Sequence, residues 1–166
     1  CPENCKFCAQ SAHYHTGIEE HPLLSEDEMV EAAKKAKATG AVRFSLVTSG
    51  RAQDQAADFK HICHTLSRIK KEVGIEICAS LGLLTYEQAC TLKALGLTRI
   101  HNNLETAPSH FPDICSTHSY TEKIAYGRLK SGNLTDQILA NAELEAQQKN
   151  TKFVEFEIGD NDTELC

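Results

Sequence analysis

Three cysteines at the start of the chain have the spacing of a metal-binding loop. Cys1, Cys5 and Cys8 form a C-x3-C-x2-C pattern, and Phe7 stands directly before the last thiol. Clusters that only transfer electrons usually have four cysteine ligands, so three thiolates leave one iron of a [4Fe–4S] cube without a protein ligand. An open iron can bind a small molecule. The spacing therefore predicts a [4Fe–4S] cluster with one reactive corner.

A structural zinc site is a second interpretation of the same loop. The three thiols and an imidazole from His13 or His15 would form a Cys3His set, which is common in structural zinc sites. Disulfides are disfavoured, because three closely spaced cysteines cannot all pair locally and no secretory signal segment is recognisable. Short cysteine spacings of this kind indicate a metal before they indicate a disulfide framework.

Composition limits the class of protein. With 166 residues, 41% of them hydrophobic and 24% charged, the chain can bury the core of one domain. No run of residues approaches the roughly 18 apolar residues that cross a bilayer, and a net charge of −6 disfavours a nucleic-acid-binding surface. Eight cysteines without a recognisable export signal favour a reducing compartment. We expect a cytoplasmic protein with small-molecule partners, and neither a membrane nor a nucleic acid among them.

Helices and strands alternate along the first three quarters of the sequence. Ser25 with Glu28, and Thr85 with Gln88, form capping boxes that predict helix starts. The pattern predicts helices at 25–40, 59–73 and 85–95, and strands at 42–48, 75–80 and 98–104. Such alternation produces right-handed crossovers and a parallel sheet with helices outside. A complete eight-unit barrel needs about 250 residues, so we predict a partial (β/α) barrel.

The last forty residues have a different character. A loop at 127–133 is followed by a polar helix at 134–148, and residues 152–158 alternate apolar with polar side chains, as a half-buried strand does. We therefore divide the chain into a partial barrel at 1–126 and a tail at 127–166 whose role is unknown. Since a partial barrel leaves strand edges uncovered, the strand at 152–158 is a candidate to cover one of them.

Four separate stretches carry a family resemblance. They are Cys-Pro-Glu-Asn-Cys-Lys-Phe-Cys-Ala-Gln-Ser at 1–11, Lys-Ala-Lys-Ala-Thr-Gly at 35–40, Asn-Leu-Glu-Thr at 103–106 and Phe-Pro-Asp-Ile-Cys-Ser-Thr-His-Ser-Tyr at 111–120. In these stretches the chain resembles biotin synthase, a family of radical S-adenosylmethionine (SAM) enzymes, from residue 1 to about 125. The resemblance implies a radical SAM barrel truncated at both ends. It also implies a sulfur-inserting transferase of biotin biosynthesis that converts dethiobiotin to biotin.

The resemblance assigns a role to each matching residue. A [4Fe–4S] cluster is held by Cys1, Cys5 and Cys8, and SAM is contacted by Phe7 at the adenine, Asn103 and Glu105 at the ribose, and Lys123 at the carboxylate. Cys78 corresponds to a ligand of a second, auxiliary iron–sulfur cluster that donates sulfur. In the family, SAM supplies a 5′-deoxyadenosyl radical that takes a hydrogen atom from dethiobiotin. The implied partners are dethiobiotin and an electron donor such as a flavodoxin or ferredoxin, with a homodimer as one assembly.

Some positions depart from the family pattern. Ser45 replaces a cysteine of the second cluster, and a hydroxyl is a poor ligand for soft iron–sulfur chemistry. A family branch with Ser here is expected to use another cluster type, so the auxiliary cluster, [2Fe–2S] or other, stays open. His101-Asn102 reverses the usual order and Lys123 replaces an arginine. Cys115 has no obvious partner.

Two alternatives to biotin synthase follow from these departures. One is another radical SAM enzyme, of the hydrogenase-maturation or methylornithine type, and the other is a zinc-binding or inactive fragment.

Overall fold

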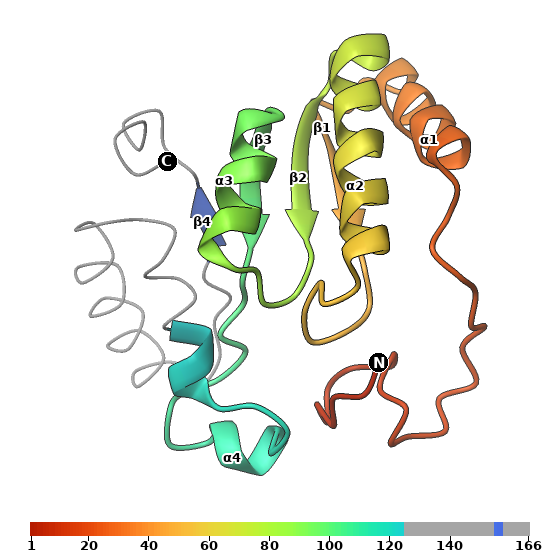
Figure 1. Cartoon of the computed structure of the whole chain (residues 1–166). Coiled ribbons are helices and arrows are strands. Elements are labelled where there is room, and N and C mark those ends of the chain that lie inside the picture. Colours follow the sequence, from red (N-terminus) through yellow and green to blue (C-terminus); the bar gives the residue numbers. More distant parts are fainter. Residues whose placement is uncertain (125–154, 158–166) are drawn as a thin grey trace.

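The computed structural model describes residues 1–124 and 155–157, in which helices alternate with strands (Figure 1). The elements are α1 (Glu26–Ala38), β1 (Arg43–Val47), α2 (Ala56–Arg68), the π-helix η1 (Ile69–Val73), β2 (Glu76–Ser80), α3 (Tyr86–Ala94), β3 (Leu97–His101), α4 (Phe111–Ile114) and β4 (Glu155–Glu157). Residues 120–124 are also helical. The loop predicted at 127–133 and the helix predicted at 134–148 lie outside the described residues.

The four strands form one sheet in the order β1-β2-β3-β4. The first three strands are parallel, as predicted, and in their register Ser45 lies opposite Cys78, which lies opposite Arg99. This arrangement confirms the α/β class and the partial barrel. β4 runs antiparallel to β3 and pairs with it at residues 155–157, so the predicted C-terminal strand does cover the free edge of β3.

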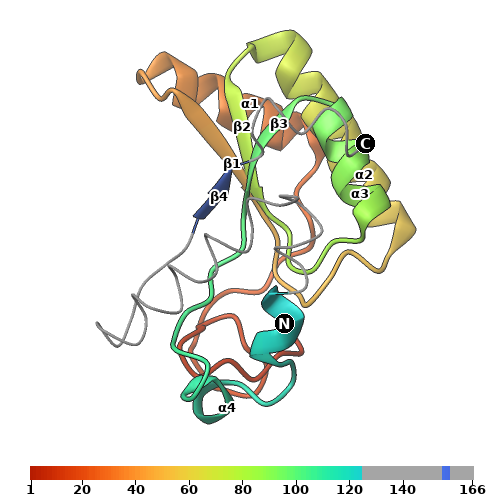
Figure 2. The ribbon, with the colours of Figure 1, turned by 90° about the vertical axis from the view of Figure 1, so that its left-hand side faces the viewer.

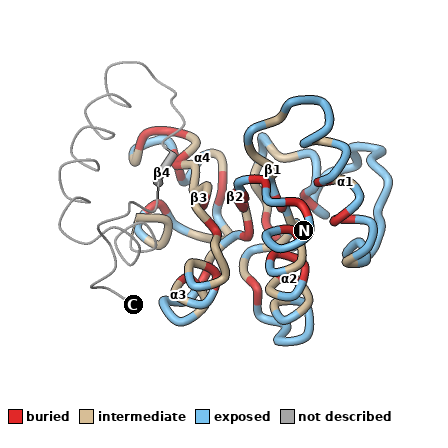
Figure 3. The backbone as a smooth tube through the Cα atoms, turned by 90° about the horizontal axis from the view of Figure 1, so that it is seen from above, coloured by how far each residue is buried: buried red, intermediate tan, exposed pale blue. Residues whose placement is uncertain are grey.

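The core lies between the sheet and the helices on one of its faces (Figures 2 and 3). Both predicted capping boxes form, at the starts of α1 and α3. Each box satisfies backbone N–H groups that a helix start leaves without partners. The helix predicted at 59–73 is α-helical to Arg68 and then π-helical, and Gly74 ends it with a φ of 64°. The fully buried core side chains include Val30, Ile62, Leu66, Ile69, Ile77, Leu81, Leu92 and Ile100.

The carboxyl ends of the parallel strands point toward the N-terminal loop and α4 (Figure 1). Here the loop after β2 touches the loop after β1, because the backbone N–H of Leu83 donates to the Arg51 carbonyl at 2.7 Å. Gly82 has a φ of +67°, and a Cβ on it would lie 2.4 Å from the Arg51 oxygen. Only glycine fits this crossing of two loops.

No helix in the described part of the chain is long and apolar enough to span a bilayer.

Replacing Gly82 should test this close approach. Gly82→Ala combines a left-handed backbone with a backbone collision, so we expect it to lower the free energy of unfolding by about 3 kcal/mol. Gly17 is the matched control, because its φ is +70° and a Cβ added there would have nothing within 4 Å. Gly17→Ala should cost only about 1 kcal/mol. Equal losses for the two variants in urea unfolding would contradict the account.

Deleting residues 151–166 removes β4 and leaves the edge of β3 without a partner. Because unpaired strand edges promote association, we expect the shortened chain to form dimers or aggregates in size-exclusion chromatography with light scattering. Deleting only 159–166 keeps β4 and should preserve the behaviour of the full chain. A soluble, monomeric product of the longer deletion would show that β4 does not protect this edge.

Candidate cofactor site

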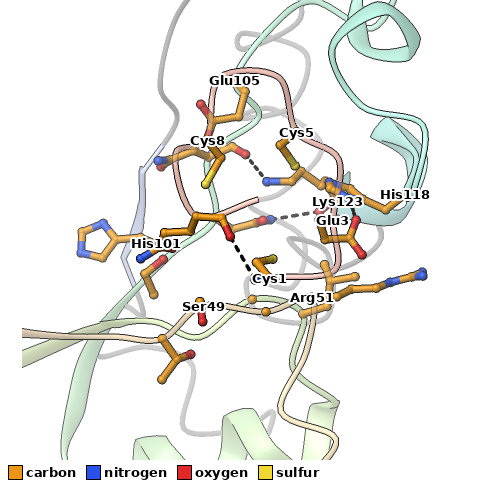
Figure 4. Close-up of a pocket in the computed structure, with 18 of the residues that line it drawn as sticks. Cys1, Glu3, Cys5, Cys8, Ser49, Arg51, His101, Glu105, His118 and Lys123 are labelled. Carbon is orange, nitrogen blue, oxygen red and sulfur yellow. Dashed lines mark hydrogen bonds and ion pairs between the residues drawn. The ribbon is translucent and has the colours of Figure 1, made fainter. Parts of the chain in front are cut away.

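A cavity of about 190 Å³ lies at the carboxyl ends of β1, β2 and β3 (Figure 4). This is the edge at which α/β barrels assemble their active sites. Every predicted site residue except Cys78 lines the cavity, namely Cys1, Cys5, Phe7, Cys8, Asn103, Glu105 and Lys123. The strand-end loops contribute further polar side chains to the wall, among them Ser49, Arg51, His101 and Asn102.

The cysteine loop is fixed to residues 116–118, more than a hundred positions away in the sequence. The Asn4 side-chain oxygen accepts from the backbone N–H groups of Ser116, at 2.9 Å, and Thr117, at 3.2 Å. The Asn4 amide also donates to the Ser116 hydroxyl at 2.7 Å. The Glu3 carboxylate accepts from the Thr117 hydroxyl at 2.5 Å and pairs with the His118 ring. We call these contacts the Glu3–Asn4 clamp.

Glu3 is buried at the centre of this clamp, with 7% of its surface exposed. Burial alone would raise the pKa of the carboxyl group, but the hydrogen bonds from Thr117 and His118 outweigh it and hold the pKa below its usual value. A buried carboxylate is tolerated only when it is paired and hydrogen-bonded. Glu3 therefore stays ionised and orients the His118 ring.

The three thiols of the loop are free and half-buried around the cavity (Figure 4). Within residues 1–124, these three sulfurs do not form a group whose donor atoms all lie within 4.8 Å of one another. Two thiolates on a tetrahedral zinc ion lie only about 3.8 Å apart. The loop thiols are therefore not gathered around a single ion, and their number matches a cube bound by one thiolate at each of three corners.

The predicted zinc set with His13 or His15 does not form in the described part of the chain. Both histidines are exposed, and Nε2 of the first lies 3.1 Å from the Pro2 carbonyl oxygen. The sequence placed them near the thiols but could not show that the loop turns their rings toward backbone and solvent.

The loop after β3 presents Glu105 to the cavity through a strained turn. The Thr106 N–H donates to the Leu104 carbonyl at 2.8 Å, and Glu105 between them has a φ of 68°. A γ-turn with positive φ is rare for a residue with a side chain, and such strain gathers at functional sites. The surrounding contacts therefore hold this carboxylate in a conformation that a free chain would avoid.

Two reciprocal hydrogen bonds join this loop to helical residues 120–124. The Asn102 amide donates to the Lys123 carbonyl at 3.0 Å, and the Lys123 ammonium donates to the Asn103 carbonyl at 2.7 Å. Burial lowers the pKa of Lys123, although the nearby Glu105 carboxylate opposes this shift. The reversed His101-Asn102 order thus gives Asn102 a positioning contact, while both side chains still line the cavity.

Cys78 lies apart from the cavity that holds the other predicted residues. Its side chain is 6% exposed, and its thiol donates to the Phe44 carbonyl at 3.6 Å. Ser45 is its neighbour in the β1–β2 register. Among the described residues this pair belongs to no group of three metal-ligating side chains, so the auxiliary cluster stays a prediction.

A fourth thiol, that of Cys115, approaches the cysteine loop and was not predicted to do so. No partner of Cys115 was obvious in the sequence, but in the structure its Sγ lies 3.7 Å from Cys5 Sγ and 3.3 Å from His118 Nδ1. Burial and the hydrogen bond to Cys115 raise the pKa of Cys5 to about 12. Burial would also raise the pKa of Cys115, but the Thr117 hydroxyl and backbone N–H groups lower it. The Cys-x2-His spacing of Cys115 and His118 is the feature of the sequence that could have indicated this contact.

Comparison with known proteins agrees with this geometry. Residues 1–140 match the model of the radical SAM superfamily. The chain is 48% identical over 126 residues to biotin synthase 2 of Corynebacterium diphtheriae, and 47% identical over 124 residues to biotin synthase of Acetivibrio thermocellus. Each match covers 75% of this chain and 38% of the relative.

A solved structure shares the fold. The crystal structure of methylornithine synthase superposes with a TM-score of 0.66 at 20% sequence identity, covering 78% of this chain and 37% of the other. The chain thus spans less than two fifths of the proteins that it matches. The match to the superfamily model covers most of the chain, and it includes the cysteine loop and every strand of the parallel sheet. The chain therefore belongs to the radical SAM superfamily.

Proposed function

We propose that this chain carries the cluster-binding and SAM-binding part of an enzyme of the biotin synthase type, which inserts sulfur into dethiobiotin. The observation that carries the proposal is the convergence of all three loop thiols with Asn103, Glu105 and Lys123 on one cavity. The identity to biotin synthases over three quarters of the chain supports the choice of reaction. The donor types also fit the cofactors, since three thiolates and a ring of polar groups surround one space.

Cys1, Cys5 and Cys8 would hold the [4Fe–4S] cluster. When bound, the cluster and SAM together supply one-electron chemistry that removes hydrogen from an unactivated carbon. The chain's own contribution is positional. The Glu3–Asn4 clamp holds the cysteine loop over the strand ends, so that the three thiols face the cavity.

The remaining wall of the cavity has the chemistry to bind SAM. Phe7 is 53% exposed, so its ring is available to the adenine face. The Glu105 carboxylate can accept from two ribose hydroxyls, and the Asn103 amide can both donate and accept. Lys123 would face the SAM carboxylate as a point charge, without the two-pronged contact that an arginine makes.

The partners follow from the same reaction. Dethiobiotin would be the small-molecule substrate, and the cluster needs an external one-electron donor such as a flavodoxin or ferredoxin. On the face of the sheet opposite the helices, Val47 is 62% exposed. A homodimer, or further parts of a longer chain, would cover it.

A second candidate is a different reaction within the same superfamily. Ser45 faces Cys78 where a sulfur-donating cluster would need two soft ligands. The fold is also shared with methylornithine synthase. Under this alternative the SAM site is unchanged, but dethiobiotin is not bound. Binding of labelled dethiobiotin to cluster-loaded protein in the presence of SAM separates the two candidates.

Anaerobic reconstitution with iron and sulfide tests the cluster site. We expect about four iron atoms per chain, which is the content of one cube. Cys8→Ser should lose most of this iron and its visible absorption, since only two thiolates would remain. Cys63→Ser, on α2 and half-buried, is the matched control and should retain both. Full iron content in the Cys8 variant would show that the cysteine loop does not hold the cluster.

The role of Glu105 is tested by an isosteric change. Glu105→Gln keeps the size of the side chain but loses the charge-assisted hydrogen bonds to ribose hydroxyls, so SAM should bind at least about tenfold more weakly. Isothermal titration of cluster-loaded protein measures this, with iron content as a check on the cluster. Glu87→Gln, in the first turn of α3 and outside the cavity wall, should bind SAM normally. An unchanged affinity in the Glu105 variant would contradict the assignment.

A further inference from the structure

A second set of metal-ligating side chains shares one residue with the cysteine loop. Cys5, Cys115 and His118 each offer a ligand atom, and these atoms all lie within 4.8 Å of one another. It is the one such group of three or more that residues 1–124 contain. Cys115 plays no part in the SAM site proposed above, so its place beside Cys5 needs a separate account.

The two sulfurs of this group lie at the distance expected for two thiolates on a single tetrahedral ion. With metal–sulfur bonds of about 2.3 Å and metal–nitrogen bonds of about 2.0 Å, two thiolates lie about 3.8 Å apart, and a thiolate and an imidazole nitrogen about 3.6 Å apart. Cys5 Sγ and Cys115 Sγ are 3.7 Å apart, and Cys115 Sγ lies 3.3 Å from Nδ1 and 3.9 Å from Nε2 of His118. The two sulfurs already lie at the distance that one ion needs, whereas the His118 ring would have to turn to bring Nε2 to the same ion.

The His118 ring is held from both sides. Nδ1 contacts the Glu3 carboxylate, so an ion would bind at Nε2 after the ring turns toward the thiols. A carboxylate behind a ligating histidine is the usual support in metal sites, where it fixes the ring and raises its basicity. Phe111 packs edge-on against the ring, with the centroids 5.4 Å apart. These contacts keep the ring beside the two thiols before any ion is bound.

The site is enclosed but reachable. Cys115 is 3% exposed, and the His118 side chain is 7% exposed. Cys5 is half-buried, and together with Glu3 and His118 it lines the cavity described above. An ion would enter through this cavity, and its fourth coordination position would face it and be open to water or to an added thiol.

We infer that Cys5, Cys115 and His118, supported by Glu3, form a mononuclear site for a thiophilic divalent ion of the Zn²⁺ class. This site and the [4Fe–4S] cluster exclude each other because both need the Cys5 thiolate. The exclusion rests on the proposed function, whereas the mononuclear site itself does not. Two thiolates and one imidazole form a ligand set that favours zinc over hard ions such as Mg²⁺ or Ca²⁺.

Cobalt is the probe, because Co²⁺ takes the place of Zn²⁺ in tetrahedral thiolate sites and gives visible absorption. The reduced, cluster-free full chain should bind one equivalent of Co²⁺ with a thiolate-to-cobalt band, and added Zn²⁺ should abolish this band. Cys115→Ser should lose the band, and His118→Gln should weaken the band and lower the affinity. Glu3→Gln should lower the affinity roughly 10–100-fold. Circular dichroism of each variant checks that it is folded.

Two reciprocal variants separate this site from the cluster site. Cys8→Ser should keep the cobalt band and lose the iron–sulfur cluster, while Cys115→Ser should lose the band and keep the cluster. Cys63→Ser should keep both. Zinc-loaded wild-type protein should take up iron and sulfide only after a chelator removes the zinc. A full cobalt band in folded Cys115→Ser, its loss in Cys8→Ser, or no cobalt binding to the wild type would each overturn the mononuclear site. Failure of the cluster alone would count against the proposed function and leave this site standing.

Discussion

The Glu3–Asn4 clamp is the interaction on which the site depends. A loop with three cysteines and few apolar side chains has no core of its own, so its conformation must be fixed by hydrogen bonds to another segment. Asn4 uses both ends of its amide for this purpose, and Glu3 is buried as an ion against Thr117 and His118. Because a buried carboxylate left without partners is costly, the loop and residues 116–118 stabilise each other's position.

The parallel sheet supplies the platform beneath this clamp. Three strands running in one direction bring their following loops to the same edge, so residues from three separate parts of the sequence line one cavity. The crossing at Gly82 and the strained turn at Glu105 show that these loops are held close, with backbone conformations that only tight packing sustains. The packed core of the sheet and helices therefore holds the cavity-lining loops in a fixed geometry.

Local chemistry was enough to predict much of this arrangement. The capping boxes, the alternation of helices and strands, and the C-x3-C-x2-C loop each depend on residues close together in sequence, and all three lie where expected. The pairing of Cys115 with Cys5 was missed because it joins two loops whose proximity arises only from the sheet. The same limit applied to His13 and His15, whose orientation depends on the backbone of the loop and not on spacing.

Cys5 is a ligand in both of the proposed metal sites. This thiol belongs to the cavity of the cluster loop and also contacts Cys115, so it stands between two modes of binding. In the first proposed site it joins Cys1 and Cys8, and in the second it joins Cys115 and His118, whose ligand atoms lie within 4.8 Å of it. In the first of these proposed sites, Lys123 would attract the carboxylate of SAM as a point charge.

The central claim is that the loop thiols hold a cube with one open iron beside a SAM-binding wall. Electron paramagnetic resonance of the anaerobically reconstituted and reduced chain, recorded with and without SAM, tests it most directly. The account predicts a [4Fe–4S]⁺ signal whose shape shifts when SAM is added, because the cofactor binds the open iron. A signal that is indifferent to SAM, or no cluster signal at all, would contradict it.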